Sequence, residues 1–205
     1  MEHKARIWLT NTAAVREDQV QAMLPLLSES EAARYRRFVR PQRQRQFLIG
    51  RVLLRRALCA ALNLPADALT VEEHVGHAPR VLLPAAVAPP GFSISHSGDW
   101  VACAVSSSTA LGLDIELLDP ARDIVALAEQ SFDAIELAAL GMEPESQRMA
   151  AFYRMWSSKE ARFKLGTGSD AAASCIALAH PQLSIVVCSA QPLAAAPAIE
   201  AFSID

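Results

Sequence analysis

The residues with the clearest capacity for chemistry begin at Gly112, where the sequence reads GLDIE. Hydrophobic residues flank two carboxylates, Asp114 and Glu116, and this alternation predicts a strand. Because residues two apart on a strand point to the same side, we expect both carboxylates on one face. Such a pair is a candidate cation site, and the same pattern also suits the solvent-exposed face of an edge strand.

A second group of charged residues lies between Trp156 and Lys164, where the sequence reads WSSKEARFK. The surrounding apolar spacing predicts a helix, on which Trp156, Glu160 and Lys164 lie along one stripe, with Lys159 beside it. A Glu–Lys pair at this spacing is also a common solvated contact, worth only tenths of a kcal/mol. This stretch therefore has both a functional and a structural interpretation.

If strand and helix meet, three carboxylates come together and repel one another. Two like charges about 4 Å apart cost about 4 kcal/mol at an effective dielectric constant near 20, so a cation between them would stabilise the group. Oxygen ligands with no His or Cys nearby suit Mg²⁺. Because Mg²⁺ usually shares its shell with phosphate oxygens, the expected substrate is a phosphate ester or anhydride.

The elements that must position these residues form two successive groups. In the first, turn signals and apolar periodicity predict strands at Arg6–Thr10 and Leu69–Glu73, a helix at Val15–Leu27, a short helix capped by Ser28 and Glu31 that runs through Phe38, and a helix from Pro41 to about Asn63–Pro65.

A hairpin completes the first group, for which we expect strands at Phe92–Ile94 and Trp100–Val105 around a turn at Ser95–Asp99. In the second group we expect a strand at Gly112–Leu117, a helix from about Asp123, another capped by Ser131 or Asp133, and a long helix from Pro144 to about Leu165 that Gly166 ends. Strands at Ser174–Ala179, Leu183–Ala190 and Ile199–Ile204 are expected to form the antiparallel sheet of the second half.

Composition narrows the class of protein. The chain has 205 residues, of which 52% are hydrophobic and 20% charged, so it can fold around a substantial core. The net charge is only −3, yet nine of the 19 basic residues are arginines between Arg34 and Arg56. This basic stripe suits either a solvated helix face or a phosphate site. Nucleic acid is disfavoured, because the overall charge is negative and no known reading motif is present.

The four cysteines lie far apart in apolar stretches without a CxxC motif, so we expect reduced core residues, not a disulfide framework or zinc site. No charged-then-apolar leader opens the sequence, and no apolar run reaches about 18 residues. We therefore expect a cytoplasmic protein without a membrane-spanning segment.

A third stretch, from Phe92 to Asp99, reads FSISHSGD. Together with Gly-x-Asp-x-Glu from Gly112 and Trp-Ser-x-Lys-Glu-Ala-x-x-Lys from Trp156, it resembles the signature of the 4′-phosphopantetheinyl transferase superfamily. The length resembles its Sfp-like branch of pseudodimeric monomers, and the resemblance spans most of residues 30–168.

The resemblance implies an α+β fold of two similar α/β halves, whose antiparallel sheets are related by a pseudo-twofold axis. Residues 1–108 would form the half that contacts the nucleotide of coenzyme A, and residues 109–205 the half with the Mg²⁺-binding and catalytic residues. It further implies a monomer that moves the phosphopantetheine arm of coenzyme A to a serine of an apo acyl or peptidyl carrier protein, as holo-[acyl-carrier-protein] synthases do.

The implied catalytic residues are those of the two charged stretches. Asp114, Glu116 and Glu160 would hold Mg²⁺ against the pyrophosphate, and Glu160 would accept the serine proton directly or through a metal-bound water. Lys159 and Lys164 would contact phosphate oxygens, with Lys164 at the transferring centre.

The implied coenzyme A contacts lie mostly in the first half. Arg34 and Arg45 match positions that hold the 3′-phosphate, although Gln46 stands where many relatives have a basic residue. Ser95 and His96 would contact the phosphates. The adenine loop departs from the family pattern, because no lysine precedes its proline; the residues around that proline are His77 and Arg80.

Two other functions use the same features. A Mg²⁺-dependent phosphoesterase or nuclease would also need the three carboxylates, although the carboxylate-x-lysine strand common in nucleases is absent. A non-catalytic protein that binds coenzyme A or a carrier protein would not need the complete set of carboxylates and lysines.

Overall fold

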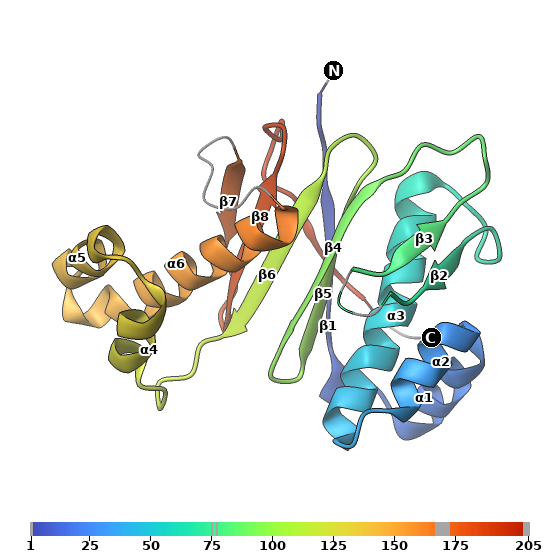
Figure 1. Cartoon of the computed structure of the whole chain (residues 1–205), viewed down its shortest axis with the longest axis horizontal. Coiled ribbons are helices and arrows are strands. Elements are labelled where there is room, and N and C mark those ends of the chain that lie inside the picture. The colour runs from blue at the N-terminus through green and yellow to red at the C-terminus, as the bar shows by residue number, and fades with distance from the viewer. Residues whose placement is uncertain (1, 75, 77, 167–172, 203–205) are drawn as a thin grey trace.

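A computed structural model gives the fold, and it describes residues 2–74, 76, 78–166 and 173–202. In the first half a strand is followed by helices and then by further strands (Figure 1): β1 (Arg6–Asn11), α1 (Glu17–Met23), α2 (Glu29–Arg36), α3 (Pro41–Leu62), β2 (Thr70–Glu72), β3 (Arg80–Leu82), β4 (Gly91–Ser97) and β5 (Trp100–Ser106). The second half contains β6 (Leu111–Leu117), α4 (Ile124–Ser131), α5 (Ala134–Met142), α6 (Glu145–Leu165), β7 (Ser174–Leu178), β8 (Leu183–Ser189) and β9 (Ile199–Ala201).

Helix ends follow the local chemistry of the sequence. Ser28 and Glu31 form the expected capping box at the start of α2, and Pro41 occupies the first turn of α3. Asp133 caps α5, whereas α6 ends at Gly166, whose φ of 84° is the left-handed conformation that glycine adopts without strain.

Two larger sheets carry most of the structure. One has the strand order β4-β5-β1-β9 and the other the order β6-β8-β7, while β2 and β3 form a separate antiparallel pair. Neighbouring strands are antiparallel throughout, except that β9 runs parallel to β1. The architecture is therefore α+β, as the sequence predicted.

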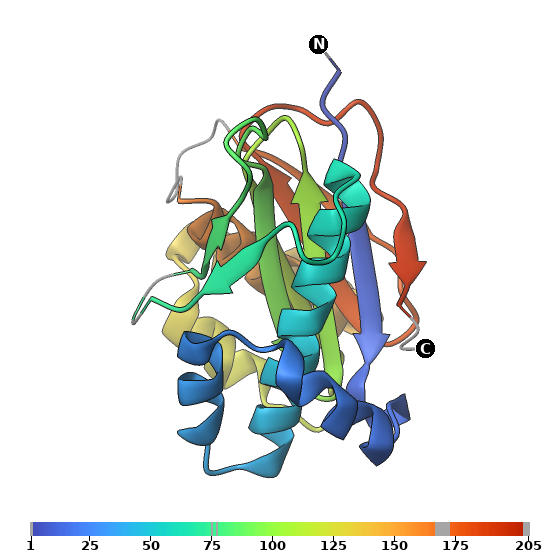
Figure 2. The same ribbon diagram turned by 90° about the vertical axis from the view of Figure 1, so that its right-hand side faces the viewer.

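The core lies in layers, because alternate residues of each strand face opposite ways. Ala102 and Ala104 of β5 pack with Leu113 and Ile115 between the two sheets. The intervening β5 residues contact α3 on the outside of the first sheet, and α6 covers the second sheet on the opposite side of the molecule (Figure 1; Figure 2 gives the turned view).

Three expectations were wrong in detail. β9 does not join the sheet of the second half but pairs with β1, across the molecule. The β4–β5 turn contains only Gly98 and Asp99, so Ser95 and His96 belong to β4 and not to the turn. The positive φ of Gly98, 55°, allows this shorter turn.

The third concerns the cysteines. Cys175 of β7 stands directly opposite Cys188 of β8, and the two form a disulfide. Strand pairing brings them together, which their spacing in the sequence does not reveal. Cys59 and Cys103 are free, as expected. β3 was not predicted either.

Within the part of the chain that the structure describes, we find no helix with the length and apolar character that crossing a bilayer requires.

Candidate active site

β4 and β6 lie side by side where the two sheets meet (Figure 1). Three serines of β4 join them, because the hydroxyl oxygens of Ser93, Ser95 and Ser97 accept hydrogen bonds from backbone N–H groups of β6. Their partners are Leu113 at 2.9 Å, Ile115 at 3.2 Å and Leu117 at 3.0 Å, respectively. We call these three residues the serine seam. It fixes the register of β4, with its His96, against β6, with its carboxylates.

Gly112 brings α6 against β6. A Cβ atom at this position would lie 1.9 Å from the carbonyl oxygen of Ala161 and 2.7 Å from the backbone nitrogen of Leu165. The backbone of α6 therefore occupies the space that any side chain would need. This close approach places Glu160 and Lys164 within reach of the carboxylates of β6.

α6, β6 and β4 together form a cavity of about 390 Å³, which we call the acidic pocket. Its lining includes both carboxylates of the predicted strand, Asp114 and Glu116, and the whole predicted helix stripe, Trp156, Glu160 and Lys164. Ile94, Ser95 and His96 of β4 complete the lining. The structure thus brings together the two stretches that the sequence singled out.

Lys164 and Ser95 hold one side of Asp114. Lys164 Nζ donates to Asp114 Oδ1 at 2.8 Å and to Ser95 Oγ at 2.9 Å, and Ser95 Oγ donates to Asp114 Oδ1 at 3.0 Å. Asp114 is only 3% exposed, and its other oxygen, Oδ2, is buried without a hydrogen-bond partner within the described residues. A buried carboxylate oxygen without a partner is costly unless something binds it.

Glu116 lies in a partly desolvated position. Burial raises the pKa of Glu116, and the neighbouring Asp114 carboxylate adds to this effect, while the hydrogen bond from Ser97 and the positive charge of Arg122 oppose it. Ser97 Oγ donates to Glu116 Oε2 at 2.8 Å, whereas Arg122 is 3.9 Å away. Glu160, by contrast, has no recorded ion pair or hydrogen bond to another described side chain.

The donor atoms of the acidic pocket fit a hard cation. Lys164 occupies one oxygen of Asp114, and residues 2–74, 76, 78–166 and 173–202 contain no ready-made cluster of three or more His, Cys, Asp or Glu ligands. The free Oδ2 of Asp114, with the carboxylates of Glu116 and Glu160 in the same wall, nevertheless supplies the oxygen ligands that Mg²⁺ prefers.

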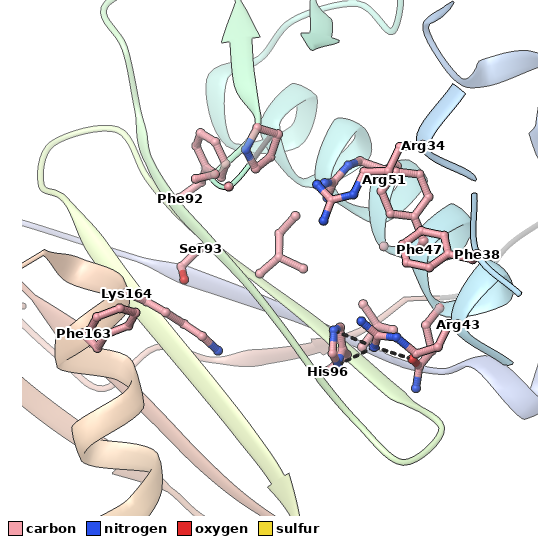
Figure 3. Close-up of a pocket in the computed structure, with 17 residues that line it drawn as sticks. Arg34, Phe38, Arg43, Phe47, Arg51, Phe92, Ser93, His96, Phe163 and Lys164 are labelled. Carbon is pink, nitrogen blue, oxygen red and sulfur yellow. Dashed lines mark hydrogen bonds between the residues drawn. The ribbon is translucent and has the colours of Figure 1, made fainter. Parts of the chain in front are cut away.

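A larger cavity of about 480 Å³, the basic pocket, adjoins the acidic one. The two share Ile94, His96 and Lys164 of their walls. Figure 3 shows Lys164 and Phe163 on one side of the basic pocket and a group of arginines and phenylalanines on the other: Arg34, Arg43, Arg51, Phe38 and Phe47. Cations and aromatic rings around one cavity suit an anionic ligand with a planar group.

Glu73 organises two of these arginines. The Glu73 carboxylate forms ion pairs with Arg34 and with Arg51, the latter at 2.5 Å. Arg51 is only 8% exposed. The guanidinium carbons of Arg51 and Arg34 also lie 4.7 and 5.5 Å from the centre of the Phe47 ring. Glu73 and Phe47 therefore hold the guanidinium groups of these two arginines in place before any ligand binds.

Arg43 contacts His96 across the pocket (Figure 3). Arg43 Nη1 lies 2.8 Å from His96 Nε2. The many protein atoms around His96 desolvate its ring and lower its pKa, and the nearby charge of Arg43 lowers it further. Because solvent still reaches the residue through the open cavity, we expect this effect to be modest.

Two predicted phosphate contacts lie elsewhere. Arg45 donates to the carbonyl oxygens of Thr12, at 2.9 Å, and Val15, and it pairs with Glu17 at 3.0 Å, so its guanidinium ties α3 to the N-terminal region. The structure does not bring it to the basic pocket.

Lys159 also has other partners. It donates to the Ser131 carbonyl and to the Glu136 carboxylate, both at 2.8 Å, and thereby links α6 to the neighbouring helices. Arg80 is exposed at the start of β3, and His77 lies outside the described residues.

Arg43 and Arg51 line the basic pocket, and the sequence analysis did not single them out. The signal was present, since Arg43, Phe47 and Arg51 are four residues apart on α3 and lie on one face of the helix. Only the position of β4 shows that this face lines a cavity.

Comparisons with known proteins agree with this geometry. Residues 14–108 match the family model described as 4′-phosphopantetheinyl transferase, N-terminal, and residues 110–180 match that of the 4′-phosphopantetheinyl transferase superfamily. The two matches cover the basic side and the acidic side of the site, respectively.

Individual relatives carry the same description. The 4′-phosphopantetheinyl transferase AcpT of Salmonella typhimurium is 34% identical over 166 residues, which cover 76% of this chain and 81% of that protein. HetI of Nostoc sp. and psf-1 of Bacillus pumilus, both also named 4′-phosphopantetheinyl transferases, are each 33% identical over 72% of this chain, which spans only 62% and 60% of their lengths. With motifs, site and alignments in agreement, the chain belongs to the 4′-phosphopantetheinyl transferase superfamily.

Proposed function

We propose that this protein transfers the 4′-phosphopantetheine arm of coenzyme A to a serine hydroxyl of an acyl or peptidyl carrier protein. The observation that carries the proposal is the common wall of the two pockets, formed by Ile94, His96 and Lys164. A nucleotide bound in the basic pocket would extend its pyrophosphate past Lys164 toward the carboxylates. The names of the aligned relatives support the same activity.

We assign the nucleotide to residues 1–108 and catalysis to residues 109–205, in two halves related by a pseudo-twofold axis. The boundary coincides with the gap between the two family matches, and each half packs one long helix against its sheet. The two halves are assigned by function and are not separate structural domains, because β9 of the second half pairs with β1 in the sheet of the first half.

The basic pocket would bind the adenosine 3′-phosphate end of coenzyme A. Arg34, Arg43 and Arg51 offer guanidinium groups to the phosphates, and hydrogen bonds to charged groups contribute about 1.5 to 3 kcal/mol each. The phenylalanine rings of the pocket would pack against adenine, and Ser95 and His96 would face the phosphates. Arg80 and His77 remain proposed contacts of the adenine loop.

The acidic pocket would hold Mg²⁺ on Asp114, Glu116 and Glu160. When bound, Mg²⁺ neutralises the negative charge that develops on the leaving phosphate. The protein contributes the fixed placement of these oxygens through the hydroxyl groups of Ser95 and Ser97 and through the close approach of α6 at Gly112.

In the transfer, the serine oxygen of the carrier attacks the phosphorus that bears the pantetheine arm. The anhydride bond breaks, and adenosine 3′,5′-bisphosphate leaves. Glu160, which pairs with no side chain among the described residues, would accept the serine proton. Lys164 uses two of its three N–H donors on Ser95 and Asp114, which leaves the third for a phosphate oxygen. We assign Lys159 to holding α5 against α6.

The test is the intact mass of several apo carrier proteins after incubation with this protein, coenzyme A and Mg²⁺, with EDTA as the control. We expect a gain of one phosphopantetheine arm, about 340 Da, that disappears with EDTA. Cleavage of coenzyme A without a carrier would instead favour a phosphoesterase. Binding of coenzyme A without any transfer would favour a binding protein.

A further inference from the structure

The three members of the serine seam share one bond and differ in another. Each accepts a backbone N–H from β6 at 2.9 to 3.2 Å. The hydroxyl group of Ser93 makes no further hydrogen bond within the described residues. Ser95 and Ser97, however, also donate their hydroxyl protons to carboxylates, Asp114 at 3.0 Å and Glu116 at 2.8 Å.

This double use fixes the direction of the hydroxyl group. A serine hydroxyl has one proton to donate and two lone pairs to accept with. Because the Leu117 N–H already occupies a lone pair of Ser97, the proton points away from that N–H, toward Glu116 Oε2. The strand pairing between β4 and β5 holds the Ser97 backbone in turn.

Glu116 depends on this contact for its position. It stands near the end of β6, its side chain is 20% exposed, and Arg122, at 3.9 Å, is beyond hydrogen-bond distance. Lys164 lines the same pocket but donates its hydrogen bonds to Asp114 and Ser95. A glutamate side chain has three rotatable bonds, and holding one oxygen restricts them all.

We propose that Ser97 is a positioning residue for the metal site: it holds Glu116 Oε2 and leaves Oε1 for the cation. The proposal rests on the proposed function, since it takes Glu116 as a ligand of Mg²⁺. It gives the last serine of FSISHS a role distinct from that of the first, although both make the same backbone bond. Partners that orient a metal ligand typically affect metal affinity by 10- to 100-fold.

The experiment measures binding of Mn²⁺, an EPR-visible substitute for Mg²⁺, to the purified 205-residue chain without coenzyme A. Ser97→Ala should weaken Mn²⁺ binding at least about 10-fold. Ser93→Ala, the matched control, loses an equivalent bond of the serine seam and should leave Mn²⁺ affinity within about twofold of wild type. Ser97→Thr keeps the hydroxyl and should restore binding.

A second measurement separates positioning from general damage. In the transfer reaction, Ser97→Ala should raise the Mg²⁺ concentration for half-maximal rate at least about 10-fold, while the KM for coenzyme A changes little. Equal Mn²⁺ affinity in Ser97→Ala and wild type, or equal losses in Ser97→Ala and Ser93→Ala, would overturn the proposal. If the wild type itself binds no Mn²⁺, the metal site of the proposed function fails, which is a distinguishable result.

Discussion

The two long helices, α3 and α6, lie on opposite sides of the molecule and use their charges differently. Both exceed 20 residues, both pack on a sheet, and both end in a left-handed residue, Asn63 after α3 and Gly166 after α6. On α3, Arg55 is bound to the buried Glu31 of α2, and Arg45 is bound to Glu17 of α1. On α6, Glu160 has no recorded partner among the described residues.

This difference separates structural charge from functional charge. The arginine-rich stripe is the most conspicuous charged feature of the sequence, yet much of it is neutralised inside the fold. Glu160 is only one charged residue, but it lines the acidic pocket. In the same pocket, Asp114 Oδ2 lacks a hydrogen-bond partner among the described residues. Exposure to a cavity, not the number of charges in the sequence, therefore indicates which charged residues can meet a ligand.

The largest effect should come from breaking the ion-pair network that joins Glu31 of α2 to the arginines of α3. Glu31 is fully buried and binds Arg55 and, at 3.5 Å, Arg51. Glu31→Ala should lower the free energy of unfolding by about 3 to 5 kcal/mol, because it leaves the Arg55 guanidinium without its carboxylate in the interior, whereas Arg51 keeps Glu73. Urea denaturation measures this free energy of unfolding. Glu29→Ala, at an exposed position of α2, should lower the free energy of unfolding far less. Equal losses of stability in the two variants would refute a structural role for this network.

Removing the charge on α6 should instead spare the fold. Glu160→Gln keeps the shape but loses a proposed metal ligand and proton acceptor, so we expect the rate of transfer to fall at least about 100-fold. Rates come from the mass of the carrier over time, and circular dichroism verifies folding. Glu145→Gln, in the exposed first turn of α6, is the control. Near-normal turnover in Glu160→Gln would remove Glu160 from the mechanism.

Moving α6 away from β6 should affect stability and activity together. Gly112→Ala would force the backbone near Ala161 to shift, at a cost of about 1 to 3 kcal/mol, and would displace Glu160 from Asp114. Denaturation and transfer rates test this prediction. A Cβ at Gly141 on α5 meets nothing within 4 Å, so Gly141→Ala should be neutral or stabilising. A fully active, stable Gly112→Ala protein would contradict the packing argument.

The smallest effect should be a pH dependence at His96. Its pKa is lowered in the folded protein, first by desolvation and then by Arg43. The unfolded chain therefore binds the proton more readily, so stability should fall as the pH drops through about 6.5, the ordinary pKa of histidine, and stay unaffected above it. His96→Gln should flatten this dependence in denaturation curves. An NMR titration with a pKa above the ordinary value would contradict it.

Local signals in the sequence determined the positions of most elements and the faces on which the carboxylates of the acidic pocket lie. The capping box of Ser28 and Glu31, the proline that opens α3 and the glycine that ends α6 each act through neighbouring backbone groups, so their effect can be predicted without the fold. The same holds for the shared face of Asp114 and Glu116 and for the stripe that contains Glu160, because strand and helix periodicity set both.

The tertiary structure alone decided which distant groups meet. It showed that β9 joins β1, that Cys175 faces Cys188, and that Arg43, not Arg45, reaches His96. Arg43 and Arg45 are only two residues apart, but on a helix this spacing turns them to different sides, and only the position of β4 determines which side lines a cavity. Local periodicity specifies the face on which a residue lies, whereas the packing of the whole chain determines what that face contacts.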